Sequence, residues 1–100
     1  MTPVLAGQVR IIRAAADLVE RSGIEDLAVS TGPGEILIQV PRHCGSTAER
    51  AARVARLAAL SGCEPATDRR PGATRGWITA LGLFAGCPVR VFTPVTEAAS

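Results

Sequence analysis

Residues 35–60 constrain the fold most, because a short alternating segment is followed closely by a long segment of helical period. Apolar and polar residues alternate over Glu35–Val40, which predicts a strand with one buried face. Pro41 ends this strand because proline has no amide hydrogen to donate to a neighbouring strand. Ser46 and Glu49 have the spacing of a capping box, which predicts that a helix begins there.

Another helix is predicted over residues 3–22, where Gly23 provides the stop signal. Its predicted buried side is an apolar stripe at helical spacing, made of Leu5, Val9, Ile12, Ala16 and Val19. Turn-forming residues fill 63–76, which predicts a mobile surface loop. Further strands are predicted at 27–31, 77–84 and 89–94, the last two joined by a tight hairpin at 85–88.

This α-β-β-α-β-β order predicts a single α+β domain over residues 1–100, a two-layer sandwich with two helices on one face of a four-stranded antiparallel sheet. Residues 18–25 and 57–64 share a pattern, so we expect a pseudo-repeat of 3–41 and 46–95. A twofold axis normal to the sheet would make equivalent strands antiparallel neighbours. The predicted strand order is then first-second-fourth-third or second-first-third-fourth.

The segment G-W-I-T-A-L-G-L-F-A-G-C-P-V-R-V-F-T-P-V, with the chain around it, resembles small uncharacterised proteins of high-GC Gram-positive bacteria. The resemblance covers roughly the second half of the chain and implies no function. Abundant Ala, Gly and Arg, with no Lys, agree with a GC-rich bacterial genome.

The composition predicts a cytoplasmic protein without metal or other cofactor. No apolar run is long enough to span a membrane, and the first residues lack the pattern of a signal peptide. Three cysteines give no disulfide framework, and with a single His they make a poor zinc set.

His43, Cys44 and Arg50 resemble the active-site loop of protein-tyrosine phosphatases and, loosely, that of rhodanese-type sulfurtransferases. In such a site Cys44 would be the nucleophile, Arg50 would hold an oxyanion, and Asp68 would be the acid. The spacing is weak support, because Cys63 and Arg69 share it by chance and the capping box places Glu49 where phosphate would bind. We therefore expect no catalysis, and keep the enzyme as a second alternative.

Residues 42–75 carry seven Arg and three acidic residues, a net charge of +4 on a chain whose total is +2. Arg50, Arg53 and Arg56 recur every three residues along the predicted helix. This basic zone predicts a possible nucleic-acid interface, formed by Arg42, Arg50, Arg53, Arg56, Arg69, Arg70 and Arg75. The simpler interpretation is a solvated helix face.

With both helices on one side, the other face of the sheet needs a cover. Leu37 breaks the alternation of its strand and is expected on this open face, together with Trp77 and its alternating neighbours. Such a surface is typical of protein contacts. The sequence therefore favours a non-catalytic interaction module that binds itself as a homodimer or another protein, and the alternative is nucleic-acid-associated regulation.

Overall fold

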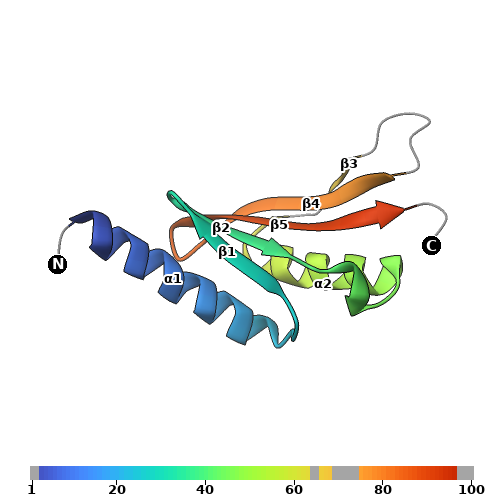
Figure 1. The fold of residues 1–100 in the computed structure, drawn as a ribbon, viewed down its shortest axis with the longest axis horizontal. Coiled ribbons are helices and arrows are strands. Elements are labelled where there is room, and N and C mark those ends of the chain that lie inside the picture. Colours follow the sequence, from blue (N-terminus) through green and yellow to red (C-terminus); the bar gives the residue numbers. More distant parts are fainter. Residues whose placement is uncertain (1–2, 64–65, 69–74, 97–100) are drawn as a thin grey trace.

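The computed structural model describes residues 3–63, 66–68 and 75–96. Its strands form one β-sheet, and both α-helices lie on the same side of that sheet (Figure 1). The element bounds are α1 Pro3–Ser22, β1 Ala28–Gly32, β2 Glu35–Gln39, the 3-10 helix η1 Arg42–Cys44, α2 Thr47–Leu60, β3 Ala66–Asp68, β4 Arg75–Phe84 and β5 Cys87–Thr96. The predicted α+β architecture, with two helices on one face of the sheet, is confirmed.

The sheet differs from the prediction in having five strands and one parallel pair. Its order is β1-β2-β5-β4-β3. The parallel pair joins β2 to β5, with Ile36 beside Val89 and Gln39 beside Phe92, while the other neighbours are antiparallel. The four predicted strands correspond to β1, β2, β4 and β5. Their order in the sheet matches the first predicted alternative, first-second-fourth-third.

The parallel pair follows from β3, which lies inside the segment predicted as a loop. The rest of that segment, 64–65 and 69–74, lies outside the described residues. Because β3 adds one chain reversal between α2 and β4, β5 runs in the direction of β2. The predicted twofold axis is therefore wrong, since it would make these strands antiparallel. The internal repeat itself stays a prediction.

The core lies between the helices and the inner face of the sheet. Its members without exposed surface include Leu18, Ile36, Ile38, Val54 and Leu57, which confirms the alternation of β2 and the apolar side of α2.

The buried side of α1 differs from the predicted stripe. Ile12 is 55% exposed, whereas Ala14, Ala15 and Leu18 are buried. Both sets of residues have helical spacing, so periodicity alone cannot distinguish them. The structure buries the set whose small alanines allow the helix to approach the sheet closely.

Two tight contacts fix the end of the sheet at which β4 turns into β5. The turn between β4 and β5 uses Ala85 and Gly86, both with positive φ (53° and 77°), which confirms the hairpin. The end of α2 meets β4, where the Leu83 amide donates to the Ser61 carbonyl at 3.2 Å. A Cβ on Gly82 would lie 2.5 Å from the Ser61 carbonyl oxygen, so glycine is needed for this approach.

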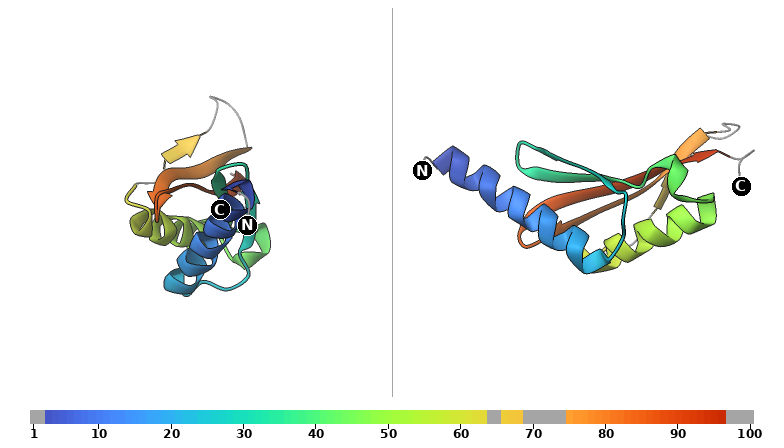
Figure 2. Two further views of the ribbon diagram at one scale, coloured as in Figure 1. Left: turned by 90° about the vertical axis from the view of Figure 1, so that its left-hand side faces the viewer. Right: turned by 60° about the horizontal axis from the view of Figure 1, so that its bottom comes forward.

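We call the sheet surface opposite the helices the outer face (Figure 2). Its residues include Glu35, Leu37, Trp77, Thr79, Leu81, Leu83, Pro88, Arg90 and Phe92. Trp77 is 46% exposed, Leu81 63% and Leu83 62%. The Trp77 and Phe92 rings meet edge to face, with centroids 5.7 Å apart. The predicted open apolar face is present, with Leu37 half-buried in it.

Candidate functional site

The link from β2 to α2 carries the residues with the most reactive side chains, His43 and Cys44. Both lie in η1, and Gly45 follows with φ 125°. The capping box is confirmed, because the Ser46 hydroxyl accepts from the Glu49 amide at 3.2 Å and the Glu49 carboxylate accepts from the Ser46 amide at 3.5 Å. The Glu49 carboxylate packs against Gly45, 2.8 Å from an ideal Cβ there. A negative group therefore occupies the place where a phosphate loop would hold its anion.

Arg50 is only 3% exposed, and its guanidinium bonds to groups other than the Cys44 thiol, which favours neither of its two predicted roles. Its guanidinium donates to the Gly45 carbonyl at 3.2 Å, to the Thr93 hydroxyl at 2.9 Å and to the Pro94 carbonyl. A further bond joins it to the Thr47 hydroxyl at 3.2 Å. Arg50 thus ties the first turn of α2 to β5, and is unsuited to hold an oxyanion or contact a nucleic-acid backbone.

Thr93 completes this buried network. Its side chain has no exposed surface, and its hydroxyl donates to the Val40 carbonyl at 2.8 Å. Among the described residues Arg50 has no carboxylate partner, and its hydrogen bonds there are all accepted by neutral oxygens. A buried cation held this way serves the fold.

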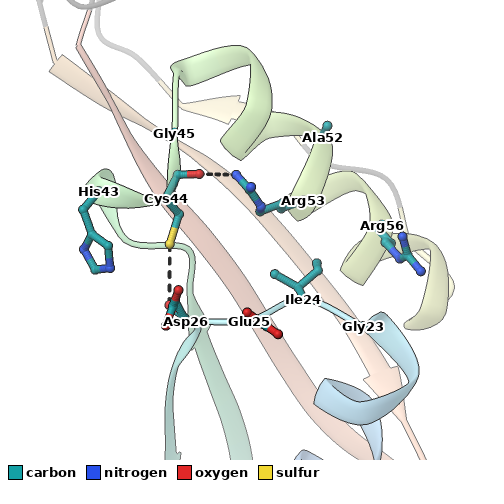
Figure 3. Close-up of a pocket in the computed structure, with 10 residues that line it drawn as sticks. All are labelled: Gly23, Ile24, Glu25, Asp26, His43, Cys44, Gly45, Ala52, Arg53 and Arg56. Carbon is teal, nitrogen blue, oxygen red and sulfur yellow. Dashed lines mark hydrogen bonds between the residues drawn. The ribbon is translucent and has the colours of Figure 1, made fainter.

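Arg53 and Arg56 instead line an open pocket of about 740 Å³ between α2, η1 and the segment that follows α1 (Figure 3). The Arg53 guanidinium donates to the Cys44 carbonyl, and the Cys44 thiol donates to the Asp26 carbonyl at 3.6 Å. Cys44 therefore connects two walls of the pocket. His43 lies at the same pocket and is exposed.

The remaining predicted residues are not brought together at this pocket. Arg42 is exposed in η1, and Arg75 begins β4. Arg69 and Arg70 lie outside the described residues. Asp68 ends β3, and β5 and β4 separate that strand from β2, so its backbone is about 14 Å from β2 across the sheet.

Three strand spacings thus separate the Asp68 backbone from β2, the strand that leads into the Cys44 segment. Together with the burial of Arg50, this spacing gives no support to the predicted arrangement of Cys44, Arg50 and Asp68, and the enzyme alternative stays a prediction. Because Arg50 is buried, the first of the three Arg side chains predicted to form the helical part of the basic zone is not exposed.

Sequence reasoning missed the acidic wall of the pocket, formed by Glu25 and Asp26. Two adjacent carboxylates after the Gly23 helix stop are a signal for a surface segment, but no local pattern indicates that this segment meets η1. Asp26 has a positive φ of 60°, a conformation that aspartate tolerates better than most residues.

The described part of the chain holds three thiols and offers no cluster suited to a metal ion. Cys44, Cys63 and Cys87 are all free. Burial raises the pKa of the Cys63 thiol. No group of three or more His, Cys, Asp or Glu side chains there is arranged to hold a metal ion. Within the same residues, neither helix is long and apolar enough to cross a membrane.

The outer face is the second candidate site. A hollow of about 320 Å³ lies on it, lined by Trp77, Thr79, Leu81, Arg90 and Phe92. Its lining is mainly apolar, with one cation.

Comparison with models of protein families, with curated proteins and with solved structures found no match to this chain.

Proposed function

We propose that this chain is a non-catalytic interaction module that forms a homodimer through the outer face of its sheet. The observation that carries the proposal is the exposure of three large apolar side chains, Trp77, Leu81 and Leu83, on one strand and one face. Contiguous apolar surface of this kind is costly in water and is typical of protein contacts. A second copy is the simplest partner, because most soluble oligomers are symmetric assemblies of one chain.

The size of the chain supports self-association. It exposes 6211 Å² for 10.3 kDa, whereas a compact monomer of that mass exposes about 5400 Å². Its radius of gyration, 14.2 Å, also exceeds the roughly 13 Å of a compact domain of this length.

The charges on the outer face support a self-complementary contact. Arg90 lies at its centre, beside Leu37 on one neighbouring strand and Leu81 on the other. Glu35 lies on the same face, two residues before Leu37, and forms no ion pair with Arg90. In a twofold dimer, Arg90 of each copy has a carboxylate of the other copy available, so neither charge need be buried unpaired.

The test is the mass in solution of the chain and of two matched variants. We expect a dimer at high micromolar concentration by sedimentation or light scattering. Leu81→Glu should weaken the dimer by about a hundredfold, because burying each leucine contributes about 1.5 kcal/mol and a twofold contact counts it twice. Ile12→Glu, at a similarly exposed apolar position on α1, is the control and should leave the dimer unchanged.

Charge reversal tests the polar part of the same contact. Arg90→Glu should weaken the dimer, and adding Glu35→Arg should restore it, because the reciprocal pairs re-form with opposite sign. A monodisperse monomer at high micromolar concentration would refute the proposal, as would a dimer that Leu81→Glu leaves intact.

The two alternatives have less support. Arg50 is buried and Arg53 is bonded to the Cys44 carbonyl, which weakens the nucleic-acid role of the basic zone. The burial of Arg50, the predicted oxyanion clamp, also weakens the support for the phosphatase or sulfurtransferase alternative. We also propose a cytoplasmic location, supported by the free state of all three thiols.

A further inference from the structure

The pocket beside Cys44 has two walls of opposite charge. Arg53 and Arg56, one turn apart on α2, form the cationic wall, and Glu25 and Asp26 form the acidic wall (Figure 3). Its volume, about 740 Å³, lies within the range of small-molecule sites.

The two walls do not neutralise each other. None of the four charged side chains has an ion-pair partner in the described part of the chain. The Arg56 guanidinium lies near Gly23, 3.7 Å from an ideal Cβ there, and forms no hydrogen bond with another described residue. Charges of both signs therefore line one open pocket, in which Arg53 is bonded to the Cys44 carbonyl and Arg56 forms no hydrogen bond with another described residue.

Hydrogen bonds through Cys44 hold the walls in place. Its carbonyl accepts from Arg53, and its thiol donates to the Asp26 carbonyl at 3.6 Å. Arg53 is half-buried, so its guanidinium has less freedom than a fully exposed side chain. Arg56, Glu25 and Asp26 are exposed, so only the Arg53 side of the pocket is pre-arranged in this way, and that part costs less conformational entropy to order on binding.

We propose that this pocket binds a small zwitterion, with its carboxylate on Arg53 and Arg56 and its ammonium on Glu25 and Asp26. Guanidinium groups suit carboxylates because they donate two parallel hydrogen bonds. The two Arg and two acidic side chains leave the lining with no net charge when His43 is neutral. A simple anion gains from one wall and is repelled by the other, as is a simple cation, so a ligand that carries both charges fits best.

The experiment measures amide chemical-shift changes in the full chain, titrated with glycine, β-alanine, 4-aminobutyrate and 6-aminohexanoate. Hexanoate and hexylamine, which carry one charge each, are the matched controls. We expect shifts at residues 23–26 and 43–56, an affinity that peaks at one chain length, and binding at least about tenfold weaker for both single-charge controls.

Two variants assign the walls. Arg56→Gln and Glu25→Gln should each weaken the best ligand by about tenfold, whereas Arg13→Gln and Glu20→Gln, exposed on α1 outside the pocket, should change its affinity less than about twofold. The absence of shifts at the pocket would overturn the proposal. Equal binding of hexanoate and 6-aminohexanoate would also overturn it and would indicate a simple anion site. None of these outcomes depends on whether the chain dimerises.

Discussion

The buried guanidinium of Arg50 predicts that this residue, which the sequence suggests is a surface charge, is among the most important for stability. Arg50→Ala leaves the Thr93 hydroxyl and the Pro94 carbonyl without their donor. A buried acceptor left unsatisfied costs about 1–3 kcal/mol; the Thr93 hydroxyl is fully buried and the Pro94 carbonyl is part-buried, and the bonds to Gly45 and Thr47 are lost as well, so we expect a loss of about 4 kcal/mol in the free energy of unfolding. That is a large part of the roughly 5–15 kcal/mol of a typical domain.

The assay is urea unfolding followed by circular dichroism, with thermal unfolding in parallel. At about 4–8 °C for each kcal/mol in a domain of this length, the midpoint should fall by at least about 15 °C. Arg50→Lys should also be destabilised, since one ammonium cannot reach the acceptors that a planar guanidinium bonds simultaneously.

Arg56→Ala is the matched control, because it removes an Arg from the same helix at an exposed position. Its effect should stay within about 0.5 kcal/mol. If Arg50→Ala proved as mild as Arg56→Ala, the reasoning about the buried network would be refuted.

Three further predictions concern the packing and titration of the fold. Gly82→Ala should lower the unfolding free energy by about 1–3 kcal/mol, because its methyl group meets the Ser61 carbonyl; an unchanged urea midpoint would contradict this. Ser46→Ala should cost about 1 kcal/mol by removing the helix cap, and Ser46→Gly only a few tenths, in the same urea assay. Burial raises the pKa of the Cys63 thiol, so the unfolded chain loses this proton at lower pH and stability should fall as pH rises above about 8.5. The decline should be smaller in Cys63→Ala; equal slopes of unfolding free energy against pH would exclude this contribution.

Local signals in the sequence were sufficient for most of the fold. The alternation of Glu35–Val40, the Ser46–Glu49 capping box and the glycine stops of both helices each act over a few residues, and the structure has all of them. The exposed outer face could be predicted as well, because two helices on one side of a sheet leave its other face uncovered.

The missed features depend on distant contacts. The three residues of β3 carry no alternation, and they form a strand because β4 lies beside them. The parallel pairing of β2 with β5 depends on that additional strand. The acidic wall of the pocket likewise arises where the segment after α1 meets η1, which no local pattern encodes.

Arg50 is a different case, because its burial could have been predicted. Residues three apart on an α-helix drift by about 60° around its axis, so Arg50 and Arg56 lie about 120° apart. Arg50, Val54 and Leu57 have the i, i+4, i+7 spacing of one face, and that face is the buried one. The apparent Arg stripe therefore crosses from the core to the solvent.

The central position of β5 has a consequence for folding kinetics. This strand follows every other element in the chain, yet it lies between β2 and β4 in the sheet. Pairing Ile36 with Val89 closes a loop of more than fifty residues, and such non-local contacts slow folding. Until β5 joins, β1 and β2 can only form an isolated hairpin, which is marginally stable in water. We therefore expect the N-terminal half to acquire its stable sheet only when β5 joins it, and the first half alone to aggregate through the exposed inner face of β2.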